Sequence, residues 1–286
     1  AIDQGKTDFP DADFRMWNRH NQMNHPSGNV DEPMPFEDGE MFDCIFSYMK
    51  TANVDPEILM ADLQTHLNDL RADRSIIVVV IRGAGPGFSA GHDLKEMQNN
   101  RNESFFRTFF EQCSTLMQSI IKLPQPVIAQ IHGTAAAAGC QLVATCDLAI
   151  ASTTAKFATP GVNIGLFCST PMVAVSRKLP RKKMMEMLLM GDLVSAETAL
   201  EFGLINRVVA YEKLEETVSN YANKIKEKSP LVLKIGKEAF YNQIDMPLAE
   251  AYKYTAEVMT QNMLAQDANE GINAFIEKRL PTWAGK

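Results

Sequence analysis

The chain has 286 residues, enough to bury most of its apolar surface in one large domain or two small ones. Hydrophobic residues make up 45% of the sequence and charged residues 22%, a globular composition that excludes a disordered or fibrous protein. The 28 basic and 35 acidic residues give a net charge of -7, which argues against nucleic acid as a partner, and no apolar run approaches the roughly 20 residues of a membrane span.

The N-terminal part of the chain changes character at about residue 41. Residues 1–40 are polar and have no sustained period, so we interpret them as an atypical extension that covers a partner surface or has little order. The apolar residues 41–49 predict a first strand. Asp55-Pro56-Glu57 supplies an N-cap, a first-turn proline and a carboxylate at a helix start. That helix is indicated by apolar residues at three- and four-residue spacing: Ile58, Leu59, Leu63, Leu67 and Leu70.

Two apolar runs without alternation, at residues 76–81 and 127–131, predict strands that are buried on both faces. Between them a phenylalanine-rich helix is predicted from Glu103 to Lys122, because Pro124 follows. These strands and the helix indicate an α/β protein.

The second half of the chain is predicted to be mostly helical after a few short strands. The strands are expected at residues 147–151, 156–158 and 204–209, and the last helices at about residues 213–228, 232–241, 248–263 and 267–279. We therefore expect an α/β core at residues 41–205 and a helical C-terminal region at residues 206–286 that serves in oligomerisation.

The cysteines are scattered and form no C-x-x-C pair, so we expect neither a disulfide framework nor a zinc site. No cluster of metal-ligating residues is evident elsewhere in the sequence. A reducing compartment is the simpler interpretation, and we expect the five thiols to be small buried side chains: Cys44, Cys113, Cys140, Cys146 and Cys168.

Two turns rich in glycine and alanine, at residues 83–94 and 133–139, follow the two buried strands. Small residues there let the backbone approach a ligand. The second turn opens a helix, whose first N–H groups have no partner within the helix. Two such amides can converge on one thioester oxygen that gains negative charge during a reaction. Composition alone leaves open the simpler interpretation that the glycines only relieve crowding where strands turn.

The residues of these turns resemble the two signature blocks of the enoyl-CoA hydratase/isomerase (crotonase) family. The resemblance is carried by residues 88–97, FSAGHDLKEM, and by residues 131–147, which include Gly139-Cys140-Gln141, and it covers about residues 50–286. It implies a crotonase-like spiral of β-β-α units. It also implies acyl-CoA as substrate or ligand with no further cofactor, and a homotrimer or dimer of trimers.

The resemblance assigns roles by position. The backbone amides of His92 and Ala138 correspond to the family's oxyanion donors, with Ala138 in place of the usual glycine. Lys95 corresponds to a lysine that faces the CoA phosphates, although a solvated helix lysine remains the alternative. Further positions expected to contact the ligand are Ala90, Gly91, Gly139, Gly161 and Cys168, and, at the adenine end in a neighbouring subunit, Phe275 and Lys278, whose alternative is an ordinary core phenylalanine and surface lysine.

Both glutamates that a hydratase of this family uses as acid and base are absent. Gln141 and Gly161 stand at their positions. The side-chain amide of Gln141 cannot accept a proton from water at neutral pH, and Gly161 has no side chain that could do so. The His92 ring, Cys168 and Ser169 are candidate substitutes, but the sequence shows no base that would activate a nucleophile. Asp93 and Asp147 are interpreted as residues that cap or brace loops.

We therefore expect an acyl-CoA-binding protein of fatty acid metabolism that is not an active hydratase, and whose reaction, if any, is an enolate-type isomerisation or a hydrolysis. The alternative is a catalytically inactive homologue that serves as a structural subunit of a larger assembly. A true hydratase with different acids is a third hypothesis. The expected location is the mitochondrial matrix, or the cytoplasm of a bacterium.

Overall fold

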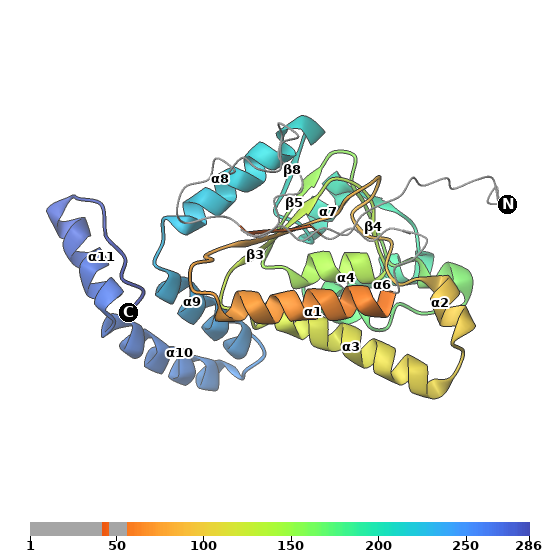
Figure 1. Ribbon diagram of the computed structural model, residues 1–286, viewed down its shortest axis with the longest axis horizontal. Helices are drawn as coiled ribbons and strands as arrows, with labels where there is room; N and C mark the ends of the chain where they lie inside the picture. The colour runs from red at the N-terminus through yellow and green to blue at the C-terminus, as the bar shows by residue number, and fades with distance from the viewer. Residues whose placement is uncertain (1–41, 46–55) are drawn as a thin grey trace, which may run out of the picture.

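The computed structural model describes the backbone of residues 42–45 and 56–286, and the side chains from residue 60 onward. The predicted extension at residues 1–40 lies outside these ranges. The fold is built around a five-stranded parallel sheet, in the order β1-β2-β3-β5-β8 (Figure 1). Its strands are β1 (Phe42–Ile45), β2 (Val79–Arg82), β3 (Val127–Ile131), β5 (Leu148–Ser152) and β8 (Arg207–Val209).

A second, smaller sheet carries the turns that follow β2 and β3. It has three strands in the order β4-β6-β7, of which β4 and β7 were not expected from the sequence. The strands are β4 (Ala135–Ala136), β6 (Lys156–Ala158) and β7 (Val194–Ser195).

The helices follow the sequence pattern closely in the second half of the chain, and the short α2 is the one that the pattern did not indicate. The helices are α1 (Pro56–Ala72), α2 (Leu94–Asn99), α3 (Glu103–Ile121), α4 (Ala138–Thr145), α5 (Pro171–Val175), α6 (Arg181–Met190), α7 (Ala196–Phe202), α8 (Leu214–Lys226), α9 (Pro230–Gln243), α10 (Leu248–Met263) and α11 (Gln266–Glu277), with 3-10 turns η1 (Pro160–Ile164) and η2 (Tyr211–Lys213).

The strands of the large sheet are buried on both faces, as the continuous apolar runs predict. Val79 and Ile81 belong to the larger core, which α1 and α3 cover. Val78 and Val80 point to the other face, where they pack with residues of α8. β8 pairs with β5, and α8 packs on β3 and β5, so the sheet continues past residue 205, the predicted end of the core.

Helix α9 of the C-terminal region is fixed to the sheet by a buried ion pair. The Lys237 ammonium lies 2.7 Å from a carboxylate oxygen of Asp147 and also donates to two main-chain carbonyl oxygens. The same carboxylate accepts hydrogen bonds from the Val127 amide and the Tyr241 hydroxyl. Asp147 therefore braces the start of β3 against α9, the structural role that we expected for it.

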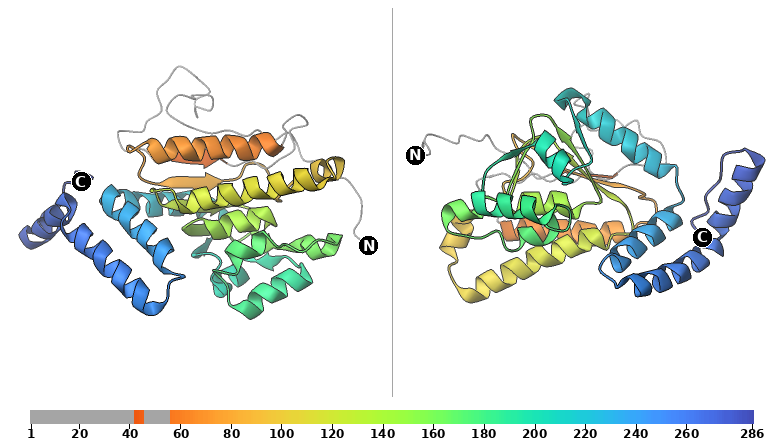
Figure 2. Two further views of the ribbon diagram at one scale, coloured as in Figure 1. Left: turned by 90° about the horizontal axis from the view of Figure 1, so that it is seen from below. Right: turned by 180° about the vertical axis from the view of Figure 1, so that it is seen from behind.

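Helices α10 and α11 continue from α9 and stand off the α/β body in both views of Figure 2. We call α10 and α11 the arm. The arm is joined to α9 at two points, through a hydrogen bond from the Asn242 amide to the Tyr254 hydroxyl and one from the Ser229 hydroxyl to Asp267. Among the residues that the structure describes, no helix is long and apolar enough to cross a membrane.

Candidate functional site

The two glycine- and alanine-rich turns meet at one edge of the large sheet. β2 and β3 are neighbouring parallel strands, so the turns that follow them leave the sheet on the same side. The turn after β2 is bonded to the turn after β3: the amides of Phe88 and Ser89 donate to the Thr134 carbonyl, and the Ala136 amide donates to the Ser89 carbonyl at 2.8 Å. The first turn therefore adds an extra bridge beside β4.

Glycine is required at two points where these turns touch. Gly91 has a φ of +93°, and a Cβ placed on it would lie 3.1 Å from the amide nitrogen of Ala138. A Cβ on Gly139 would lie 2.2 Å from the carbonyl oxygen of Ser89. The residue that precedes His92 is thus in contact with the Ala138 amide, so the amides predicted to share one acceptor come from backbones in contact.

Ala137 precedes α4 and has an unusual backbone conformation, φ 50° and ψ -116°, which residues other than glycine rarely adopt. Its amide donates to the Ala158 carbonyl and its own carbonyl accepts from the Gln141 amide, so both of its peptide groups are fixed. The Ala138 amide donates to no other atom of the described chain, and the His92 amide likewise has no acceptor there. Both are available to a ligand, and their use as an oxyanion hole remains a prediction.

The His92 ring lies in an aromatic pocket on α3. Its centroid is 4.6 Å from that of Phe109 and 6.1 Å from that of Phe110, both in edge-to-face arrangements. Burial lowers the pKa of the ring to about 4, so the imidazole is neutral at physiological pH. Its buried Nε2 has no hydrogen-bond partner among the described residues. The ring, a candidate substitute for the absent glutamates, therefore packs against phenylalanines.

Gln141 is buried on α4, and its side-chain oxygen faces the Cys113 thiol of α3 at 4.0 Å. Its main-chain carbonyl accepts from the Thr145 hydroxyl. The side chain of Gln141 is thus a neutral amide held against the core.

Gly161, where the sequence predicts that a second glutamate is absent, lies against the side chain of Cys168. The Gly161 amide donates to the Cys168 sulfur at 3.3 Å, and a Cβ on Gly161 would lie 3.0 Å from that sulfur and 3.1 Å from the Leu166 carbonyl oxygen. Burial raises the pKa of the Cys168 thiol, so the sulfur is protonated at neutral pH. A side chain at residue 161 would therefore crowd the Cys168 sulfur and the Leu166 carbonyl, which would have to shift by a few tenths of an ångström.

Asp93 and Lys95 stand at the start of α2, directly after the first turn. The Asp93 carboxylate accepts hydrogen bonds from the amides of Lys95 and Glu96, which is the N-cap role that we predicted for it. Lys95 and Ala90 are both exposed beside the turn. The sequence did not reveal this helix because it has only six residues.

Phe275 lies on α11 and Lys278 is the C-cap residue of this helix, which stands far from the turns of the same chain (Figure 1). Phe275 is 85% exposed, which rules out the alternative that it is an ordinary core phenylalanine. Within one copy the structure does not bring these residues to His92 and Ala138.

Sequence reasoning missed a groove of about 1010 Å³ along the outer surface of α3. Phe106 and Phe110 contribute its apolar lining, and Arg101 and Arg107 lie among its polar residues. Phe110 also touches the His92 ring, so the groove adjoins the first turn. Two pairs of adjacent phenylalanines in the predicted helix, at residues 105–106 and 109–110, were the signal that could have indicated it.

The fold and the paired turns define a member of the enoyl-CoA hydratase/isomerase family, whose model matches residues 50–286. The chain belongs to this family, which confirms the resemblance and the predicted fold. It is 45% identical to enoyl-CoA hydratase domain-containing protein 3, mitochondrial, of Rattus norvegicus over 76% of this chain and 75% of the relative. The Homo sapiens protein of the same name is 43% identical over 84% of this chain and 79% of the relative.

Solved structures show the same relationship. The crystal structure of an enoyl-CoA hydratase from Mycobacterium smegmatis superposes with a TM-score of 0.83 at 42% identity, covering 87% of this chain and 96% of that chain. The crystal structure of human enoyl Coenzyme A hydratase domain-containing protein 3 gives a TM-score of 0.80 at 40% identity and covers 87% of this chain and 98% of that chain.

Proposed function

We propose that this protein binds an acyl-CoA thioester whose carbonyl oxygen accepts hydrogen bonds from the backbone amides of His92 and Ala138. The observation that supports this most is the contact between the two turns, in which Gly91 lies against the Ala138 amide nitrogen. Two fixed amides stabilise an oxygen that becomes negatively charged, and the loss of one such donor raises a barrier by about 3 to 4 kcal/mol. The methyl group of Ala138 narrows the approach without removing its amide.

The reaction that we propose proceeds through an enolate or tetrahedral intermediate and adds no water to a double bond. Hydration needs one group that takes a proton from water and another that delivers a proton to the adjacent carbon. Gln141 is neutral, and Gly161 has no side chain and lies against the Cys168 sulfur. Double-bond isomerisation or thioester hydrolysis of a fatty acyl-CoA is therefore the chemistry that the pair of amides fits best.

A second candidate is a catalytically inactive homologue that serves as a structural subunit of a larger assembly. The loop at Gly161 favours it, because this loop offers no proton-transfer group to replace the lost glutamate. The two candidates differ in whether the protein binds the thioester at all.

Titration calorimetry with CoA and octanoyl-CoA separates these candidates. Binding of octanoyl-CoA supports the thioester site, whereas no heat at high micromolar ligand leaves only the inactive subunit. A crotonyl-CoA hydration assay tests the third hypothesis: substantial turnover by the wild-type protein would overturn our reading of the missing glutamates. The Gln141→Glu/Gly161→Glu variant is made with and without Cys168→Gly, because the sulfur occupies the space beside residue 161.

We further propose that copies of the chain associate as a ring, a homotrimer or a dimer of trimers. Two exposed apolar surfaces lie on different parts of the molecule, one on the arm and the other over η1, α5 and α6 (Figure 1). A contact that joins one surface to the other is head-to-tail, and it closes as a ring when the rotation between successive copies is one third of a turn. Sedimentation equilibrium measures the outcome, and a monomer at micromolar concentration contradicts it. The first surface includes Leu248, Tyr252, Met263, Leu264, Phe275 and Ile276, and the second Ile164, Leu166, Phe167, Met185, Leu189 and Met190.

A mitochondrial location is proposed because the relatives described above carry that word in their names. Fractionation of the source cells with an antibody against the chain tests it. Recovery in the cytosolic fraction alone contradicts it.

A further inference from the structure

The two amides proposed to hold the thioester oxygen share a feature of the backbone. Each follows a residue with a positive φ, which is 93° at Gly91, before His92, and 50° at Ala137, before Ala138. A positive φ turns the next peptide group away from the direction that it has in a regular strand or helix, so its N–H can point out of the turn. The direction of each donor therefore depends on how firmly the residue before it is held.

The two preceding residues are held in different ways. The Ala137 amide donates to a main-chain oxygen, the carbonyl of Ala158, at 3.0 Å. The Gly91 amide donates to the side-chain hydroxyl of Ser89 at 3.3 Å, and it has no main-chain acceptor among the described residues. The direction of the first donor thus depends on a single side chain.

Ser89 contacts both turns. Its amide donates to the Thr134 carbonyl at 3.1 Å, and its carbonyl accepts from the Ala136 amide at 2.8 Å. A Cβ on Gly139 would lie 2.7 Å from the Cβ of Ser89 and 2.8 Å from its hydroxyl oxygen, so the side chain packs directly on the backbone at the start of α4. The hydroxyl therefore lies between the turns, beside the residue that precedes one proposed donor and the residue that follows the other.

The bond between Ser89 and Gly91 is also shielded from water. Ser89 is 6% exposed, and Gly91 is buried. A buried amide without an acceptor costs free energy, so the Gly91 peptide group would rotate toward another acceptor if the hydroxyl were removed. Because the His92 amide belongs to the next peptide group, it would turn with this movement.

We propose that Ser89 is a positioning residue that aims the His92 amide at the thioester oxygen. This inference rests on the proposed thioester site, and Ser89 acts through Gly91 rather than by contact with the substrate. Hydrogen bonds to a charged oxygen are about twice as strong as bonds to a neutral one. A misdirected donor therefore weakens the binding of a negatively charged intermediate more than the binding of a neutral thioester.

The test compares two ligands that differ in the charge on the thioester oxygen. Acetoacetyl-CoA loses a proton to solvent from the carbon between its two carbonyl groups, and the resulting enolate, which absorbs in the near ultraviolet, carries part of its negative charge on the thioester oxygen. Octanoyl-CoA keeps a neutral carbonyl. The ratio of enolate to ketone in bound acetoacetyl-CoA is measured by absorbance at a fixed pH, and the affinity for octanoyl-CoA by titration calorimetry.

Three variants are compared with the wild-type protein. Ser89→Ala removes the acceptor of the Gly91 amide, and Ser89→Cys keeps a weaker one. The matched control is Ser195→Ala, because the Ser195 hydroxyl accepts the Thr198 amide at 3.1 Å and caps α7 outside the two turns. This control removes the same kind of bond, from a main-chain amide to a serine oxygen.

We expect Ser89→Ala to lower the ratio of enolate to ketone about tenfold and to change octanoyl-CoA affinity less than about twofold. Ser89→Cys should restore part of the ratio, and Ser195→Ala should leave both readouts at their wild-type values. Equal weakening of both ligands in Ser89→Ala, or an unchanged ratio, overturns the positioning role. If Ser89→Ala does not fold, Ser89→Cys carries the same comparison, with an expected loss of about threefold.

These results are distinguishable from a failure of the proposed function. A wild-type protein that binds neither ligand refutes the thioester site itself. A wild-type protein that binds acetoacetyl-CoA without raising its ratio of enolate to ketone above that of the free ligand refutes the paired amides as donors. If the wild-type protein raises this ratio and Ser89→Ala raises it equally, the thioester site stands and only the role of Ser89 is overturned.

Discussion

Replacing His92 by leucine should remove a large part of the acid sensitivity of this protein. The ring packs against Phe109 and Phe110, and burial lowers its pKa from 6.5 to about 4. The difference of about 2.5 between these values corresponds to about 3 kcal/mol of free energy, at 1.36 kcal/mol for each factor of ten.

The direction of the pH effect follows from whether the folded or the unfolded chain binds the His92 proton more tightly. Between pH 6.5 and 4 the unfolded chain carries a proton on His92 and the folded chain does not, so the free energy of unfolding falls as the pH falls through this range. Above about pH 7 the ring is neutral in both states and contributes no slope. The leucine variant has no titrating group at position 92 and therefore lacks this contribution.

Urea unfolding at a fixed protein concentration, repeated from pH 4 to pH 7.5, measures the effect. The gap between wild type and His92→Leu should change by about 3 kcal/mol across the range. The matched control is Phe110→Leu, which alters the same pocket without a titratable group and should shift stability equally at every pH. Parallel curves for wild type and His92→Leu would refute the assignment of a buried, neutral ring.

Three further substitutions test the packing that supports the site. Lys237→Met leaves the Asp147 carboxylate buried without its cation, so the free energy of unfolding should fall by about 3 kcal/mol or more in urea, and a loss below about 1 kcal/mol would contradict a buried pair. Gly139→Ala places a methyl carbon 2.2 Å from the Ser89 carbonyl oxygen, so it should cost about 1 to 3 kcal/mol and weaken octanoyl-CoA binding; an unchanged melting temperature would show that the turns are not in contact. Asn102→Ala removes the side chain that caps α3 and should cost about 1 kcal/mol by thermal unfolding, whereas a neutral result would mean that water replaces the cap.

The central sheet could be predicted because its strands have a strong local signal. A run such as residues 76–81 has no polar position, so it fits only a strand with both faces covered, and Val78 and Val79 indeed belong to different cores. The small residues of the two turns likewise predicted close backbone contact. Gly91 and Gly139 show why they are small: each would place a side chain inside the other turn.

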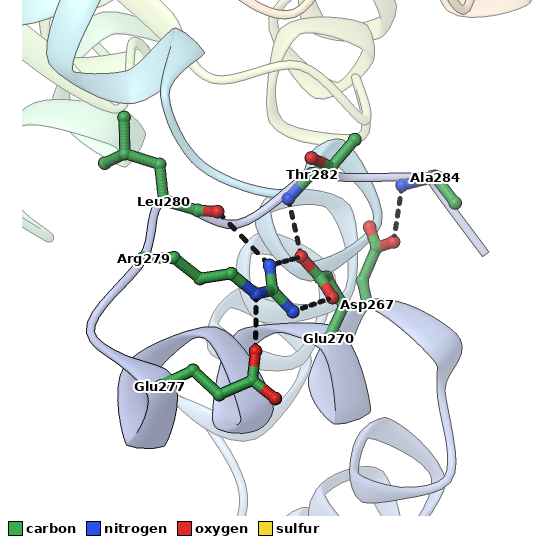
Figure 3. Close-up of polar contacts among 7 residues, drawn as sticks. All are labelled: Asp267, Glu270, Glu277, Arg279, Leu280, Thr282 and Ala284. Atoms are coloured by element: carbon green, nitrogen blue, oxygen red, sulfur yellow. Dashed lines mark hydrogen bonds and ion pairs between the residues drawn. The ribbon is translucent and has the colours of Figure 1, made fainter.

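The rest of the site depends on contacts between residues far apart in the sequence, and such contacts produce no periodic pattern along the sequence from which they could be predicted. That the His92 ring would pack on Phe109 could not be predicted from the turn alone. The sequence predicted that a glutamate is absent at Gly161, but not that the Cys168 sulfur lies against this residue. Glu270 and Arg279 form an ion pair across the end of α11, and only the folded chain shows that this pair lies beside the C-terminal residues that follow the helix (Figure 3).

The way in which α9, α10 and α11 are joined has a mechanical consequence. The three helices are hydrogen-bonded to one another, α9 to α10 at Asn242–Tyr254 and the start of α9 to α11 at Ser229–Asp267. A push on α11 from a neighbouring molecule must therefore carry α9 along. Because Lys237 anchors α9 to the carboxylate that holds the first residue of β3, the displacement arrives at the strand that leads into the second turn.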